Sequence, residues 1–146
     1  MKILIGFEES QAVCKAFRKL GHDAFSCDLQ ECSGGHPEWH MKCDIFAAIH
    51  DREWDLIILH PPCTYTALCG NRWYYNSDLR REGILLCYRA WQAACNVCER
   101  VVLEQPKTIM QKHLGPKSQV IHPWQFGHGE TKETWLWIKG VPHLEP

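Results

Sequence analysis

The residues best suited to chemistry follow a short, strongly apolar run. Leu56–Leu59 is apolar throughout, and His60-Pro61-Pro62-Cys63 comes directly after it. Such a run predicts a strand buried on both faces, as in a parallel sheet. The prolines end the strand, because they cannot donate ladder hydrogen bonds. Cys63 is therefore expected just past a strand's carboxyl end, where open α/β sheets bind ligands. A thiol at that place is a candidate nucleophile.

Three acidic residues are expected at the same edge of the sheet. Asp28 ends one predicted strand, Glu104 follows another, and Asp44 lies just before a short predicted helix. An acidic residue about 20 positions after the first strand's turn suits ribose hydroxyls, as in dinucleotide-binding folds. The group predicts an adenosine-containing cofactor beside Cys63. The alternative is that Asp28 and Asp44 are helix caps and Glu104 is a surface carboxylate.

The elements that would position these residues alternate along the chain. Strands are predicted at 2–7, 24–29, 55–60, 100–103 and 135–138, and helices at 10–20, 45–50, 76–99 and 108–113. Ser10 is the expected N-cap of the helix at 10–20, and the cap of the helix at 76–99 is expected within Asn76-Ser77-Asp78. Residues 31–41 read as a loop. This order predicts a single doubly wound, Rossmann-like α/β domain over residues 1–146.

Composition restricts the class of protein. The chain has 146 residues and a net charge of −1, which suits one domain with one core. No apolar stretch approaches the roughly 20 residues of a membrane span, and no segment resembles a signal peptide. We expect a cytoplasmic protein with no membrane partner. Its nine cysteines are expected to be reduced, with Cys95-x-x-Cys98 in the core.

Charge and metal-ligand patterns leave alternatives open. Residues 1–60 carry six Lys/Arg and ten Asp/Glu, whereas residues 61–146 carry ten and seven. The basic second half fits either a polyanionic partner or an ordinary solvated surface.

A cluster of cysteine and histidine residues could bind zinc, but its spacings do not match a paired-ligand pattern, so a metal-free loop is favoured. It consists of Cys27, Cys32, His36, His40 and Cys43.

Taken in order, these motifs resemble the DNA cytosine C5-methyltransferases that use S-adenosyl-L-methionine (SAM), in the short form found in phages and prophages. Pro61-Pro62-Cys63 matches the Pro-Pro-Cys loop of that family, and Glu104-Gln105-Pro106 matches its Glu-Asn-Val or Glu-Asn-Pro motif. Asp28 and Asp44 match the acidic residues after its second and third strands. The segment 122–132, followed by Leu136-Trp137, resembles the C-terminal segment of the short phage form.

The resemblance implies a mechanism. The Cys63 thiolate would attack C6 of a cytosine flipped out of the DNA stack, and Glu104 would contact N3 and the exocyclic amine. Ring carbon C5 would then attack the SAM methyl group and lose its proton. The glutamate must be held partly protonated to donate to N3. DNA, including single-stranded DNA, is the implied partner, and the bacterial cytoplasm the implied location if the chain is phage-encoded.

The resemblance also implies which residues bind cofactor and substrate. Asp28 would hold the SAM ribose and Asp44 the adenine amine. The full set of implied cofactor contacts is Phe7, Glu8, Glu9, Ser10, Asp28, Leu29, Asp44, Ile45 and Pro61. The implied substrate contacts are Pro62, Thr64, Arg72 and Lys132.

The sequence departs from the family pattern in several places. The first loop, Gly6–Ser10, has no glycine after Phe7, where the family has Phe-x-Gly-x-Gly. Gln105 replaces Asn, and the Arg-x-Arg motif that contacts cytosine O2 is absent, with Lys132 or Arg72 as substitutes. The chain also has no room for a target-recognition domain, so it is a reduced form of the fold. We expect weak specificity, a protein partner that supplies recognition, or a smaller or single-stranded substrate.

Two other functions fit the same residues. In an amino-methyltransferase, a Pro-Pro-aromatic loop grips an exocyclic amine, and His60–Tyr65 resembles that loop with Cys63 in the aromatic position. A catalytically silent protein on the same fold would bind SAM or nucleic acid without transferring a methyl group. The aromatic residues near Arg72 would stack a base or belong to the core and rim, and these are Trp73, Tyr74 and Tyr75.

Overall fold

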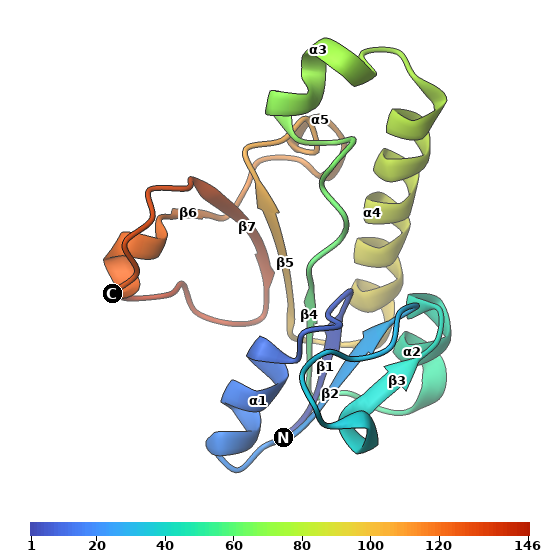
Figure 1. The fold of residues 1–146 in the computed structure, drawn as a ribbon, viewed down its shortest axis with the longest axis vertical. Coiled ribbons are helices and arrows are strands. Elements are labelled where there is room, and N and C mark those ends of the chain that lie inside the picture. The colour runs from blue at the N-terminus through green and yellow to red at the C-terminus, as the bar shows by residue number, and fades with distance from the viewer.

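A seven-stranded sheet runs through the computed structural model, which describes residues 1–146 (Figure 1). Its strand order is β3-β2-β1-β4-β5-β7-β6. The parallel strands are β1 (Lys2–Gly6), β2 (Asp23–Asp28), β3 (His40–Lys42), β4 (Leu56–Leu59) and β5 (Val101–Pro106). The antiparallel strands are β7 (Thr134–Lys139), which pairs with β5, and β6 (Gln119–Ile121), which pairs with β7. The predicted doubly wound α/β architecture is confirmed.

Helices cover both faces of this sheet. Figure 1 shows α1 (Ala12–Lys19) on one side and α2 (Ile45–Asp51) and α4 (Asp78–Val97) on the other. The short helices are α3 (Asn71–Tyr74) and α5 (Gln111–Leu114). Three 3-10 turns complete the chain, namely η1 (Pro37–Trp39), η2 (Leu68–Gly70) and η3 (Pro123–Phe126). No helix combines the length and apolar character that a membrane crossing requires.

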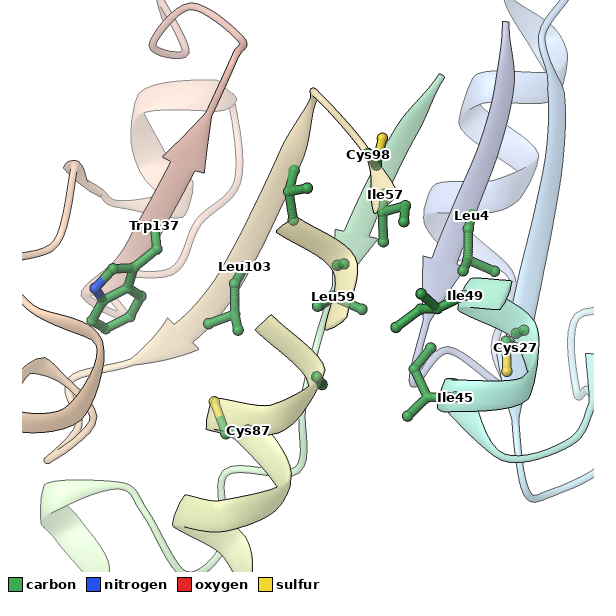
Figure 2. Packing of buried hydrophobic residues seen from close by; sticks show 14 of the residues in the cluster. Leu4, Cys27, Ile45, Ile49, Ile57, Leu59, Cys87, Cys98, Leu103 and Trp137 are labelled. Carbon is green, nitrogen blue, oxygen red and sulfur yellow. The ribbon is translucent and has the colours of Figure 1, made fainter. Parts of the chain in front are cut away.

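The core explains why the central strands read as unbroken apolar runs. Ile3, Leu4 and Ile5 are all fully buried, because successive side chains point to opposite, covered faces. Leu4 belongs to the larger cluster, where β4 and β5 pack against α2 and α4 (Figure 2). Ile3 and Ile5 pack on the other face, with residues of α1. Cys98 is buried in the larger cluster and Cys95 packs against it, so the predicted core role of this pair is confirmed.

The structure adds elements that the sequence pattern did not predict. Strands β3 and β6 have three residues each, and helix α3 has four. Segments this short carry no usable periodicity. Strand β3 lies at the end of the predicted loop 31–41 and forms because its backbone pairs with β2. Helix α4 was predicted correctly, since Ser77 caps it by accepting from the Arg80 N–H.

Candidate functional site

The end of β4 and the middle of β5 bring two titratable side chains together. Leu59 pairs with Leu103 across these strands, so His60, directly after β4, and Glu104, the next residue of β5, lie side by side. His60 Nδ1 is 3.3 Å from Glu104 Oε2, and each side chain is 27% exposed. His60 Nε2 is buried and has no hydrogen-bond partner. The sequence prediction missed His60, although its place directly before the two prolines was a signal.

The loop that carries Cys63 is held by a buried amide. Gln105 is 1% exposed, its Nε2 donates to the Pro61 carbonyl at 2.5 Å, and its Oε1 accepts from Thr66 Oγ1 at 3.0 Å. The N–H groups of Thr66 and Ala67 donate to the Cys63 carbonyl. The half-buried Cys63 therefore lies on a tight turn whose two ends are tied to β5. Gln105 therefore holds the loop, a role that the sequence difference at this position, Gln where the resembling family has Asn, did not predict.

A hollow of about 320 Å³ opens at the carboxyl ends of the strands. Its volume is within the range of about 300–1,000 Å³ that small-molecule sites occupy. Five predicted cofactor contacts line this hollow, namely Phe7, Asp28, Leu29, Asp44 and Ile45. The other lining residues are Cys27, Gln30, Cys43, Pro62 and Leu86. Apolar walls with two carboxylates suit a ligand that carries a flat ring and hydroxyl or amine donors.

Both carboxylates keep an oxygen for a ligand. Asp28 Oδ1 accepts from the Gln30 N–H at 2.9 Å, and Asp44 Oδ1 accepts from the Phe46 N–H at 2.8 Å. Neither second oxygen bonds to the protein. Asp44 is the N-cap of α2, so the helix-cap interpretation is correct for this residue, and the cap leaves it able to line the hollow.

The first loop keeps left-handed turns without glycine. Phe7 has φ 62° and Gln11 has φ 59°, a conformation that costs a non-glycine residue about 1–2 kcal/mol. Tertiary contacts hold this loop in place. Gln11 is fully buried, donates to the His36 carbonyl and accepts from the His36 N–H. A Cβ at Gly34 would lie 2.5 Å from the Ser10 carbonyl oxygen. Packing against residues 34–36 therefore holds the first loop in a conformation that usually favours glycine.

Glu8 caps helix α1, where the sequence pattern predicted Ser10. The Glu8 carboxylate is buried and accepts from the Val13 N–H at 2.6 Å and the Cys14 N–H at 3.2 Å. Ser10 Oγ is 3.5 Å from the Ala12 nitrogen, at the limit of a hydrogen bond. The prediction of Ser10 as the N-cap was wrong, because the carboxylate satisfies two N–H groups of the helix end.

A second, smaller hollow lies beside the first loop. It has a volume of about 290 Å³ and shares Phe7 with the first hollow. Glu9 is half-buried there, and its carboxylate makes no hydrogen bond to the protein. The full lining is Phe7, Glu8, Glu9, Ser10, Ala12, Val13 and His60. Phe7 of the first loop therefore borders both hollows, and the second hollow reaches His60, which contacts Glu104.

Of the remaining predicted cofactor and substrate contacts, only Pro62 lines the first hollow. Pro61 is buried beneath the loop, and Pro62, not Pro61, lines the first hollow. Thr64, Arg72 and Lys132 are exposed. The Arg72 guanidinium lies 5.3 Å from the Trp73 ring centroid, and neither Arg72 nor Lys132 bonds to Cys63 or Glu104. The structure therefore does not bring the predicted substitutes for the Arg-x-Arg motif into contact with Cys63 or Glu104.

The residues of the zinc hypothesis are not gathered around one point. His36 stacks on Trp39, and His40 contacts Ser26 Oγ and the Gln30 carbonyl. Only Cys27 and Cys43 meet, where the Cys27 thiol donates to the Cys43 carbonyl. Burial, aided by Cys43, raises the pKa of Cys27 to about 12. No group of three or more His, Cys, Asp or Glu side chains is arranged to hold a metal ion.

No protein-family model and no curated protein matches this sequence. Solved structures do match. A proposed DNA modification methyltransferase encoded within an Escherichia coli prophage has a TM-score of 0.62 at 14% identity, over 94% of this chain and 46% of its own. The Dnmt2 methyltransferase of S. pombe has a TM-score of 0.61 at 14% identity, over 99% and 52%. A human methyltransferase 10 domain-containing protein has a TM-score of 0.56 at 10% identity, over 97% and 72%.

These similarities concern the fold. The chain spans about half the length of the first two structures. The sheet of this chain, with antiparallel β7 beside β5, is typical of Rossmann-like methyltransferases. The chain has the Rossmann-like methyltransferase fold.

Proposed function

We propose that this protein is a SAM-dependent methyltransferase that acts on C5 of cytosine in DNA. The observation that carries this proposal is the placement of three features at one sheet edge. The Pro-Pro-Cys loop is tied to β5, Glu104 lies on β5 beside it, and the carboxylates Asp28 and Asp44 line a neighbouring hollow. The similarity of the fold to that of methyltransferases supports the assignment of this hollow to SAM.

The residues of the two hollows fit SAM. The free oxygen of Asp28 would accept from the ribose hydroxyls, and that of Asp44 from the adenine amine. Phe7 and Ile45 would pack on the adenosine, and Glu9 would bind the methionine ammonium, because both Glu8 oxygens already cap α1. Bound SAM would supply an electrophilic methyl group.

Cys63 and Glu104 divide the work on the base. The Cys63 thiolate forms a bond to C6 of the cytosine, which makes C5 nucleophilic. Glu104 donates a proton to N3 as charge develops on the ring and accepts from the exocyclic amine. The target base must leave its stack to reach these groups. The C6–sulfur bond breaks when C5 loses its proton, and this frees Cys63.

Exposed aromatic residues near the loop support a nucleic-acid substrate. Trp73 is 74% exposed and Tyr75 is 73% exposed, in and just after α3. Such rings stack on bases at about 1–3 kcal/mol per base. Thr64 and Arg72 lie in the same exposed segment, and Lys132 precedes β7, whose first residue pairs with Pro106 at the end of β5. Single-stranded DNA, or duplex DNA offered by a recognition partner, fits this surface.

Asp28→Asn is expected to weaken SAM binding about 10- to 100-fold, measured by isothermal titration calorimetry. Hydrogen bonds to charged groups contribute about 1.5–3 kcal/mol, and Asn keeps the contact to Gln30 while it removes the charge. Asp23→Asn is the matched control, because Asp23 is exposed at the opposite end of the same strand. Equal SAM affinity in both variants would show that Asp28 does not bind the cofactor.

The product of methyl transfer tests the proposed reaction. The protein is incubated with labelled SAM and single-stranded DNA, duplex DNA or RNA, and the nucleosides are separated after digestion. We expect label in 5-methylcytosine from DNA. Label in N4-methylcytosine or N6-methyladenine would contradict the proposal and show that the protein is an amino-methyltransferase. SAM binding without transfer to any nucleic acid would leave a silent binding protein.

A further inference from the structure

His60 contacts Glu104 but has no part in the proposed reaction of Cys63 and Glu104 with the base. Its Nδ1 contacts Glu104 Oε2 at 3.3 Å, and its backbone N–H continues the sheet by donating to the Gly6 carbonyl. Its Nε2 is buried without a partner. A buried ring nitrogen without a hydrogen bond costs about 1–3 kcal/mol, which is unusual for a residue that only fills space.

The groups around His60 are acidic. Glu104 faces it from β5, and Glu8 and Glu9 line the same hollow from the loop between β1 and α1. Ala12 and Val13 are the α1 residues in that lining, and both are neutral. Cys63 follows three residues later on the same loop. Within this group, His60 is the single side chain that carries a positive charge when protonated, and histidine is the side chain whose charge changes between about pH 5 and 8.

The proposed role of Glu104 requires a source for the proton that it donates to N3, and His60 can supply that proton. To donate to N3 of the base, Glu104 must carry a proton at the moment when the thiolate adds. A carboxyl group usually has a pKa near 4, so an isolated glutamate rarely carries this proton at neutral pH. An imidazolium in contact with the carboxylate can hold the proton nearby and transfer it when the base demands it.

We propose that His60 is a positioning residue that stores the proton Glu104 delivers to the base, a role that rests on the proposed function. The proposed step starts from protonated His60 and the Glu104 carboxylate, which meet through Nδ1 and Oε2. As the Cys63 sulfur forms its bond to C6, the C5–C6 π electrons move into the ring. Glu104 Oε2 takes the Nδ1 proton from His60, and the Glu104 carboxyl group passes its proton to N3 as negative charge develops there. The step ends with neutral His60, Glu104 carboxylate and the protonated adduct, so protons and charge balance.

His60→Asn separates proton storage from packing. The asparagine amide can donate to Glu104 from the position of Nδ1, but it does not titrate. The readout is the rate of covalent adduct formation with DNA that contains 5-fluorocytosine, in the presence of SAM, from pH 5.5 to 9. The wild-type rate should rise as the thiolate forms and fall as His60 loses its proton. The variant should react about 10²-fold more slowly at pH 7.5, with its alkaline fall moved to lower pH.

The controls distinguish the outcomes. His113→Asn makes the same change on the exposed helix α5 and should keep the wild-type profile. A His60→Asn profile with unchanged shape, whether or not the rate falls, would overturn proton storage, because a structural role lowers the rate at every pH. A wild-type protein that forms no adduct at any pH would overturn the proposed C5 chemistry and the His60 role with it.

A measurement without substrate tests the pair directly. The His60 ring nitrogens are followed by ¹⁵N NMR during a pH titration of the full chain and of Glu104→Gln. Because a neighbouring carboxylate favours imidazolium, removal of its charge should move the titration of His60 to lower pH. A titration unchanged by Glu104→Gln would overturn the coupling.

Discussion

Cys63→Ser should abolish covalent capture of DNA that contains 5-fluorocytosine in the presence of SAM. The fluorine at C5 cannot leave as a proton does, so the enzyme stays bonded to C6 after methyl transfer. A serine hydroxyl is far less nucleophilic than a thiolate near neutral pH. Loss of a covalent nucleophile lowers turnover by several orders of magnitude, so we expect adduct formation and methyl transfer to fall at least ~10³-fold.

The adduct is measured as a mass increase of the protein, and methyl transfer as label in DNA. Cys69→Ser is the matched control, since Cys69 is an exposed cysteine only six positions further along the chain. It should retain wild-type capture. Methyl transfer that survives Cys63→Ser, with no adduct in the wild-type protein, would instead indicate direct attack by an exocyclic amine.

Gln105→Ala should destabilise the fold and disable the site together. The substitution leaves the buried Pro61 carbonyl without its donor, and it leaves the Thr66 hydroxyl with only its 3.4 Å contact to the Cys63 carbonyl. Each unsatisfied buried group costs about 1–3 kcal/mol, so the free energy of unfolding should fall by about 2–4 kcal/mol. The loop then loses its tie to β5, and a displacement of about 1 Å at a reacting group can cost 10²-fold in rate.

Urea denaturation measures the first effect, and methyl transfer under conditions where the variant is folded measures the second. Gln92→Ala on the exposed face of α4 is the control, and it should change stability by no more than about 0.5 kcal/mol. Gln105→Asn, with a side chain one methylene shorter, should have a stability between those of Gln105→Ala and the wild type, because it cannot reach both partners. Wild-type stability in Gln105→Ala would show that the amide does not hold the loop.

Much of the fold could be predicted because its signals are local. Unbroken apolar runs predict β1 and β4, and Asn76-Ser77-Asp78 with spaced apolar residues predicts α4. The same signals place Asp28 at the carboxyl end of β2 and Cys63 beyond the carboxyl end of β4. Phe7, Leu29 and Ile45 were placed by the family resemblance, and they line one hollow with Asp28 and Asp44.

Local signals failed where a contact decides the conformation. Glu8 displaced Ser10 as the cap of α1, because a buried carboxylate reaches two helix N–H groups at once. Phe7 and Gln11 take left-handed turns that the sequence would assign to glycine, since residues 34–36 pack against the loop and hold it.

The sequence by itself determined the order of the main elements and placed Asp28 at a strand end and Cys63 just past one. The expectation that Glu104 follows a strand was wrong, because β5 continues through Glu104 to Pro106 by pairing with β7. Burial periodicity, prolines and caps are encoded within a few residues of where they act. Only the tertiary structure decided that His60 meets Glu104 and that Gln105 holds Pro61, contacts between residues 44 positions apart. Pairs so far apart meet because β4 and β5 align in one register, and the register depends on the packing of the whole sheet.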